Sequence, residues 1–208
     1  RCHRHDKRLG EVYSVRVSRS AYVRRDDWQS LRRCGGGALW HTGAGMLGGL
    51  IALLGSPPSN LWSDLKRIAS LGDAEDYVEL RLKTRDGVTG TLSVNGGLIE
   101  PFPPGVEILG SHGRLRIEEN AGEGILRSID PKTPLPRRRA SVRTPPLEEK
   151  KENLRLVDAP VSLGDGVETG AEAFWRSVYR TVCMAADFPV SLDDEIENIR
   201  YLQLASSI

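Results

Sequence analysis

The sequence predicts an α+β fold: a single domain over residues 1–208, built on a large, predominantly antiparallel open sheet with helices packed on one face. Three observations support this prediction. Runs of strand type follow one another with short turns between them, which favours antiparallel pairing over a βαβ rhythm. Helical patterns stand apart from these runs, one early in the chain and two at its C-terminal end. With 39% hydrophobic and 27% charged residues, the composition is typical of a globular chain with a sizeable core.

The first part of the chain predicts a strand, a polar connection and an apolar helix. Residues 11–19 alternate, with Tyr13, Val15 and Val17 on one face, which is the pattern of a half-buried strand. Residues 21–33 are polar and rich in arginine. Three glycines at 35–37 then interrupt the chain before a periodic apolar stretch, residues 39–54, which predicts a helix ended by Gly55.

The middle of the chain predicts strands, and its end predicts helices. Strand-type runs cover residues 60–70, 77–82, 88–94, 106–109 and 115–117, so that we expect about six to eight strands in all. Residues 131–152 hold five prolines and predict an exposed loop. Two helices are expected over residues 168–186 and 192–206. The first carries an apolar stripe of Phe174, Val178 and Val182, and Ser191 caps the second.

Charge, apolar runs and cysteines exclude several classes of function. The net charge is +1, so no global field attracts nucleic acid, and we expect no nucleic-acid partner. The longest apolar run, residues 44–55, is shorter than the roughly 20 residues of a membrane span, and we expect no membrane partner. Three widely spaced cysteines favour a reducing compartment, and we expect a cytoplasmic protein. Metal-ligand types gather only at the chain end, without a second ligand pair, which predicts no metal site: Cys2, His3, His5 and Asp6.

Residues 35–55 resemble the signature of the glucose–fructose oxidoreductase / inositol dehydrogenase (Gfo/Idh/MocA) family. There, a Gly-Gly-Gly turn leads into a helix that bears Asp-or-Asn-x-Gly-x-His-x-x-Asp and ends near Leu-Leu-Gly. Other segments similar to the C-terminal domain of that family are residues 10–17, 62–68, 72–77, 110–115, 174–178 and 189–194. The resemblance covers nearly the whole chain. It implies the substrate-binding and oligomerisation domain of an oxidoreductase that acts on a sugar or polyol with NAD or NADP, and a homodimer that pairs through the open sheet face.

Two departures from the family pattern bear on activity. The cofactor-binding half of the family, with its glycine-rich turn and catalytic lysine, is not present in these residues, so we expect no cofactor to bind this chain. The family's carboxylate or amide position falls on His41, its histidine on Gly45 and its second aspartate on Gly48. A glycine has no side chain that could transfer a proton. The catalytic motif is therefore degenerate, and we expect the isolated chain to be inactive.

His41 is the titratable side chain left at this position and is the candidate catalytic residue, with packing against Trp40 or Trp28 as the structural alternative. Trp28, Trp40 and Thr42 are the candidate substrate-lining residues, although large aromatics are also ordinary core residues. We expect added bulk to be tolerated at Gly48, and leave Gly45 open.

Two functions remain open at this point. One is the substrate-binding half of an oxidoreductase, and the other is a non-catalytic interaction domain that kept the fold and lost the chemistry.

Overall fold

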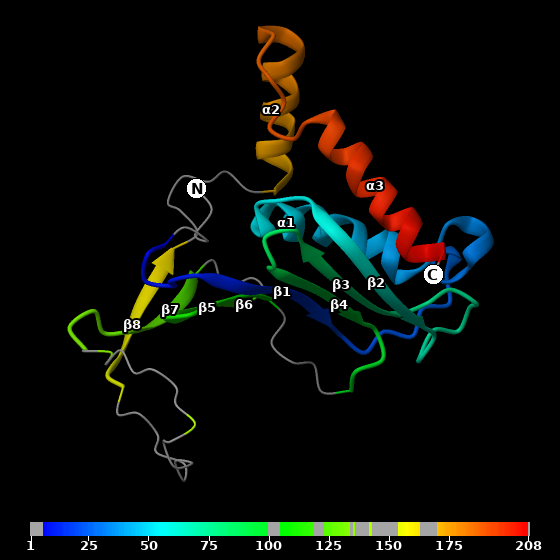
Figure 1. Cartoon of the computed structure of the whole chain (residues 1–208). Helices are drawn as coiled ribbons and strands as arrows, with labels where there is room; N and C mark the ends of the chain where they lie inside the picture. Colours follow the sequence, from blue (N-terminus) through cyan, green and yellow to red (C-terminus); the bar gives the residue numbers. More distant parts are fainter. Residues whose placement is uncertain are drawn as a thin grey trace.

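The structure is a computed structural model that describes residues 6–99, 105–118, 123–133, 135, 142, 154–162 and 170–207. Its strands form one eight-stranded sheet in the order β2-β3-β4-β1-β5-β6-β7-β8 (Figure 1). Neighbouring strands are antiparallel except for β1 and β4, which run parallel. The strands are β1 (Val12–Ser20), β2 (Pro58–Lys66), β3 (Tyr77–Thr84), β4 (Thr89–Asn95), β5 (Gly105–Gly110), β6 (Gly113–Glu118), β7 (Glu123–Ile129) and β8 (Leu156–Ser162).

Helices cover one face of this sheet, and the predicted α+β class is confirmed. The predicted helix over residues 39–54 is a π-helical turn, η4 (Leu39–Gly43), that continues into α1 (Ala44–Leu54). Two short 3₁₀ turns, η2 (Trp28–Ser30) and η3 (Arg32–Cys34), precede it. The C-terminal helices are α2 (Gly170–Met184) and α3 (Leu192–Ser207). Gly55 ends α1 in the left-handed conformation, as its sequence position predicts.

The core lies between α1 and the β1–β4 half of the sheet. The apolar face of the helix is fully buried through Leu47, Leu50 and Leu54, which belong to one cluster with Leu82 and Leu92 of the sheet. α3 lies beside α1 and over β2, where the Ser63 hydroxyl donates a hydrogen bond of 2.8 Å to the carbonyl oxygen of Ala205. By length and composition alone, the helical segment of residues 32–54 passes as a candidate membrane span, and 33% of its apolar window is buried inside the structure.

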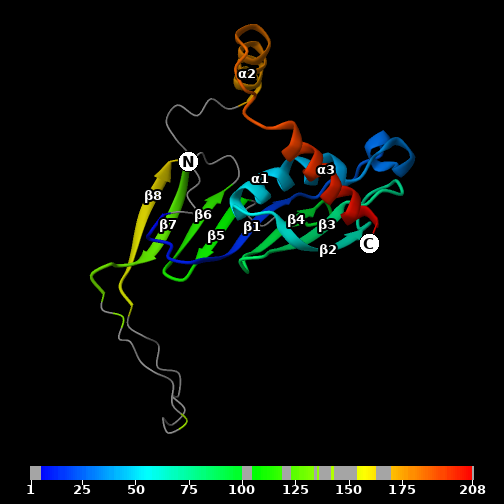
Figure 2. The ribbon, with the colours of Figure 1, turned by 45° about the horizontal axis from the view of Figure 1, so that its top comes forward.

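α2 departs from the expectation that all helices pack on the sheet. It points away from the sheet in two views (Figures 1 and 2). Its predicted apolar stripe is largely exposed, with Val182 at 77% of its maximal accessibility and Phe174 at 51%. The amphipathic pattern correctly predicted a helix, but periodicity does not specify what covers the apolar side.

Two strands differ from their predicted form because of local backbone features. A register shift between Val12 and Ser14 buries Val12 and leaves Tyr13 exposed, so Tyr13 does not share a face with Val15 and Val17 as the alternation predicts. β2 ends at Lys66 rather than continuing to residue 70, because the Asp76 carboxylate binds the backbone beyond it.

The sequence analysis also did not predict the last two strands of the sheet, which pair across a long segment of the chain. β7 and β8 were not among the expected runs, and β8 pairs with β7 across the proline-rich segment. That segment, residues 131–152, lies outside the described residues apart from residues 131–133, 135 and 142.

The open face of the sheet is charged rather than apolar. Ion pairs cross it between Arg16 and Glu107 at 3.4 Å and between Arg127 and Asp158 at 2.7 Å. The Arg81 guanidinium lies 5.6 Å from the ring centre of Trp62. Strand alternation places these side chains opposite the helix-covered residues.

Candidate functional site

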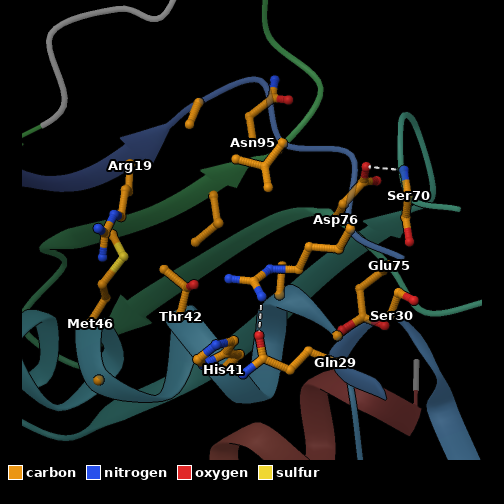
Figure 3. A pocket seen from close by; sticks show the side chains of 18 residues that line it. Arg19, Gln29, Ser30, His41, Thr42, Met46, Ser70, Glu75, Asp76 and Asn95 are labelled. Carbon is orange, nitrogen blue, oxygen red and sulfur yellow. Dashed lines mark hydrogen bonds between the residues drawn. The ribbon is translucent and has the colours of Figure 1, made fainter. Parts of the chain in front are cut away.

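A cavity of about 520 Å³ opens between the first turns of the η4–α1 helical run and the ends of β1 and β4. Loops on either side complete its wall (Figure 3). The lining residues are Arg19, Ala21, Val23, Arg25, Gln29, Ser30, Gly37, Ala38, His41, Thr42, Gly45, Met46, Ser70, Glu75, Asp76, Val94, Asn95 and Gly96. Ligand pockets fall within about 300–1,000 Å³, so this cavity has the size of a small-molecule site.

The triple-glycine turn fixes one end of the cavity because Gly36 and Gly37 leave no room for side chains. Gly37 has φ +122°, a conformation that favours glycine, and a Cβ there would overlap the Glu75 carboxylate. The Gly37 N–H also donates a hydrogen bond of 3.0 Å to the carbonyl oxygen of Gln29. The turn is therefore packed directly against two other segments of the wall.

Glu75 anchors the helical run that starts here. The backbone N–H of Leu39 donates to Glu75 Oε1 at 3.2 Å, and the N–H of Ala38 donates to the Glu75 carbonyl oxygen at 2.9 Å. Glu75 is only 8% exposed. A carboxylate at a helix start satisfies backbone donors that have no intrahelical partner and interacts favourably with the helix dipole.

Asp76 organises the opposite loop in the same way. Its carboxylate accepts hydrogen bonds from the backbone N–H groups of Ile68, Ala69 and Ser70, at 2.6, 2.7 and 2.7 Å. Charge-assisted bonds of this kind are stronger than neutral ones. The loop after β2 is thereby held against the cavity.

Two of the four residues proposed from the sequence line the cavity. His41 and Thr42 both belong to η4 and to the lining, and the N–H of His41 donates to the Gly37 carbonyl oxygen at 3.1 Å. His41 and Gln29 both line the cavity, and the Gln29 side chain accepts a hydrogen bond from Arg25 (Figure 3). Single π-turns of this type are frequent at functional sites.

The two tryptophans lie outside the lining. Trp28 is 60% exposed and Trp40 is 39% exposed. Successive residues of a helix point about 100° apart, so Trp40 diverges from the direction of His41. Neither residue is packed in the core, which was their other interpretation.

Much of the wall was not singled out from the sequence. Arg19, Arg25, Gln29 and Glu75 come from segments that only the tertiary structure brings together. The adjacent carboxylates before β3 were a usable signal, because acidic residues are uncommon inside a domain unless they bind backbone or charge partners.

Gly45 and Gly48, which the sequence resemblance aligns with the family's acid–base residues, differ in their surroundings. No atom outside its own helical turn lies within 4 Å of a Cβ built on Gly45, and Gly45 lines the cavity. A Cβ on Gly48 would lie 2.9 Å from Asn198 Nδ2, because α3 packs against this turn of α1. The structure thus argues against the sequence-based expectation that Gly48 is the tolerant position.

The described residues do not form a site for a nicotinamide dinucleotide or for a metal cluster of three ligands. Gly43, Gly45 and Gly48 have the spacing of a dinucleotide fingerprint, but they lie inside the η4–α1 helical run rather than in a turn between a strand and a helix. They do not fit a pyrophosphate, because no strand-to-helix turn presents free backbone N–H groups at these glycines. Among the described residues there is no group of three metal-ligating side chains. Cys2, His3 and His5 lie outside those residues.

Comparisons with known proteins agree with the architecture. Three similar solved structures are a NAD-binding protein from Listeria innocua (TM-score 0.71, 18% identity, covering 99% of this chain and 58% of that one), an oxidoreductase from Bacillus cereus (0.66, 14%, 98% and 57%) and GenD2 from gentamicin A biosynthesis in complex with NAD (0.67, 18%, 98% and 54%). The chain thus spans 54–58% of the length of these proteins. No curated protein matches the sequence.

A family model adds a match at the sequence level. The model described as the GFO/IDH/MocA C-terminal domain matches residues 4–116, which include β1, the triple-glycine turn, the η4–α1 helical run and strands β2–β5. This match and the fold agree with the resemblance of residues 35–55. The chain therefore belongs to the GFO/IDH/MocA C-terminal domain family.

Proposed function

We propose that this chain is the substrate-binding domain of a NAD- or NADP-dependent oxidoreductase that acts on a sugar or polyol. The observation that supports this function is the cavity at the start of the η4–α1 helical run, with His41, Thr42 and Gly45 in its lining. These residues occupy the part of the chain that resembles the family's catalytic motif. The polar wall residues Ser30, Ser70 and Asn95 are suited to hydrogen bonds with hydroxyl groups.

The catalytic motif of this domain is proposed to be degenerate. Gly45 and Gly48 bring no donor or acceptor side chain to the cavity, which leaves His41 as the imidazole in the lining. His41 is exposed at the cavity wall and is the side chain placed to exchange a proton with a substrate hydroxyl. Alone, the chain is expected to catalyse no redox reaction.

Isothermal titration calorimetry tests the binding function. The chain is titrated with glucose, galactose, myo-inositol and glucitol, and in parallel with NADH and NADPH. We expect saturable binding of at least one sugar or polyol, weakened in Thr42→Ala and unchanged in Gly49→Ala, because Gly49 lies in α1 outside the cavity lining. Absence of carbohydrate binding would refute the proposed substrate class. A stoichiometric micromolar site for either nucleotide would refute the assignment of cofactor binding to another part of the protein.

An interaction domain without a ligand is the second candidate. The loss of side chains at Gly45 and Gly48 supports it, because a binding module has no need of the acid–base set. Such a domain would leave all titrations flat while retaining a partner-binding surface.

The oligomerisation role is proposed for the open face of the sheet, which would pair with its copy about a two-fold axis in a cytoplasmic homodimer. The exposed Trp62 supports this choice of face, and exposed charged side chains surround it. Charged contacts of exposed groups weaken as salt rises. Sedimentation velocity at low ionic strength is expected to give a dimer that dissociates partly at high salt, and a monomer under both conditions would exclude this interface.

A further inference from the structure

Glu75 is a buried carboxylate in the wall of the cavity. Its side chain belongs to the lining, at the end that also holds Ser30 and Ser70 (Figure 3). The residue is only 8% exposed, which is uncommon for a glutamate unless a partner compensates its charge. What compensates this charge therefore bears on what the cavity can bind.

Within the described part of the chain, one oxygen of the Glu75 carboxylate is used. Oε1 accepts the N–H of Leu39 at 3.2 Å, and no ion pair or further hydrogen bond reaches either oxygen from those residues. The buried side-chain oxygen that lacks a partner there is Thr181 Oγ1, so Glu75 Oε2, which also lacks one, is an accessible atom. Because the carboxylate otherwise packs against Gly37, Oε2 is open on the side of the cavity.

The backbone compensates the charge of Glu75 only in part. The N–H of Leu39 belongs to the start of the η4–α1 helical run, and a helix start carries the equivalent of about half a positive elementary charge. Buried ionised groups are normally paired with a full opposite charge. The site therefore favours a ligand that brings a positive charge to Oε2.

The other charged side chains of the lining do not supply that charge. The Asp76 carboxylate accepts three backbone N–H groups through its two oxygens. Arg25 is bonded to Asp27 at 3.0 Å, and Arg19 lies at the opposite end of the cavity (Figure 3). Of the two lining carboxylates, Glu75 is thus the one with an oxygen that accepts no hydrogen bond from the described residues.

We propose that the substrate of this cavity is an amino sugar whose ammonium group binds Glu75. This inference rests on the proposed function as a carbohydrate site. An ammonium group brings a full positive charge and three donors, one of which can bond Oε2 in a charge-assisted hydrogen bond. The Ser30 hydroxyl donates to the carbonyl oxygen of Asp27 at 2.7 Å, so its oxygen keeps acceptor capacity for a second ammonium proton.

The same carboxylate distinguishes an amine from its neutral analogues. A sugar hydroxyl can donate to Oε2 but leaves the negative charge of Glu75 uncompensated, and an acetamido group does the same. Low polarity around a buried group strengthens its electrostatic interactions, which increases the difference between a charged and a neutral donor. Affinity should therefore rank the ammonium above the hydroxyl and the acetamido substituent.

Matched ligands test the inference on the whole chain. Glucosamine, galactosamine and 6-amino-6-deoxyglucose are compared with glucose and galactose by isothermal titration calorimetry, with the chloride concentration matched and the amines protonated. We expect at least one amino sugar to bind about tenfold or more tightly than its neutral parent, as for an added charge-assisted hydrogen bond. Equal affinities throughout would overturn the amino-sugar inference and leave the proposed carbohydrate function standing. Absence of binding by all of these sugars would overturn both.

N-acetylglucosamine separates charge from bulk. It carries the nitrogen substituent without the positive charge, so it should bind no more tightly than glucose. A gain in affinity that N-acetylglucosamine shares with glucosamine would overturn recognition of the charge.

Variants assign the effect to Glu75. Glu75→Gln keeps an acceptor oxygen for the N–H of Leu39 and removes the charge, so it should abolish the preference for the amine. Asp73→Asn is the matched control, because this exposed carboxylate lies in the same loop outside the lining and binds the N–H of Arg32 at 2.8 Å. The control should retain the preference. A preference that survives in Glu75→Gln, or that is lost equally in Asp73→Asn, would refute the role of Glu75.

A circular dichroism melt checks that each variant is folded. If Glu75→Gln is unfolded, the decision falls to Glu75→Asp, whose shorter side chain withdraws the carboxylate and should weaken the preference. An undiminished preference in Glu75→Asp would overturn direct contact between Glu75 and the amine.

Calcium chloride and magnesium chloride separate the two kinds of cation that a carboxylate can bind. An ammonium site predicts that neither metal gives saturable binding that depends on Glu75, in keeping with the lack of three clustered metal-ligating side chains among the residues that the structure describes. Binding of either metal that is lost in Glu75→Gln and is tighter than that of the amino sugars would overturn the assignment.

Discussion

Replacing Gly45 with alanine should stabilise the protein. Gly45 lies inside the continuous helical run from η4 to α1, and no atom outside its own helical turn approaches within 4 Å of the added Cβ. Alanine is favoured over glycine in a helix interior by about 1 kcal/mol, mainly because glycine loses more backbone entropy on folding. The added methyl group meets no clash that would reduce this gain.

The expected magnitude follows from these terms. Because Gly45 is close to the start of α1, we expect a gain of about 0.5–1 kcal/mol in the free energy of unfolding. For a chain of this size, 1 kcal/mol corresponds to a rise in Tm of about 2–4 °C. Gly49→Ala is the matched comparison, because no atom lies within 4 Å of a Cβ there either. It should give a similar gain.

Gly48→Ala should behave differently. Its Cβ would lie 2.9 Å from Asn198 Nδ2, and Asn198 is only 8% exposed, so its amide has little room to move away. Crowding should cancel the helix-propensity gain or exceed it.

Urea denaturation followed by circular dichroism measures all three variants against the parent chain. The reasoning fails if Gly45→Ala lowers the free energy of unfolding, or if Gly48→Ala stabilises as much as Gly49→Ala. A change in the slope of the transition would point instead to an altered unfolded state.

Three further outcomes are expected. The hydrogen bond from the Tyr77 hydroxyl to Glu79 and partial burial raise the pKa of Tyr77 to about 12. Since this pKa lies above the unfolded value of about 10, the protonated hydroxyl stabilises the folded state fully below pH 10, and this stabilisation is lost as pH rises towards 12. When phenolate absorbance is followed against pH, the transition at the highest pH should be missing in Tyr77→Phe. An unchanged titration curve would contradict the assignment. Asp76→Asn should destabilise the chain by about 1–3 kcal/mol, because an amide has one acceptor oxygen for the N–H groups of residues 68–70, and hydrogen exchange should accelerate at those amides rather than elsewhere. In a full-length protein that carries this domain, His41→Ala should abolish no turnover of sugars or polyols, because the motif is proposed to be inactive; robust turnover that is lost specifically in His41→Ala would overturn this proposal and establish His41 as the surviving acid–base group.

The sequence by itself determined the local elements. Periodicity identified β1, the η4–α1 run and both C-terminal helices, because spacings of two and of 3.6 residues are properties of neighbouring residues. Ser191 was correctly identified as a helix cap, and its hydroxyl accepts the N–H of Asp194 at 3.1 Å. The order of motifs in residues 35–55 also identified the family before any geometry was available.

Only the tertiary structure decided what depends on distant residues. The parallel register of β1 with β4 aligns Arg19 with Val94 and thereby forms the floor of the cavity. Glu75 reaches the start of the η4–α1 run from far along the chain. The angle between successive side chains around a helix directs Trp40 away from the cavity wall that His41 lines. The packing of α3 against α1 crowds Gly48 but leaves space at Gly45. Local patterns cannot fix these features, because they arise from long-range strand pairing and side-chain packing between elements.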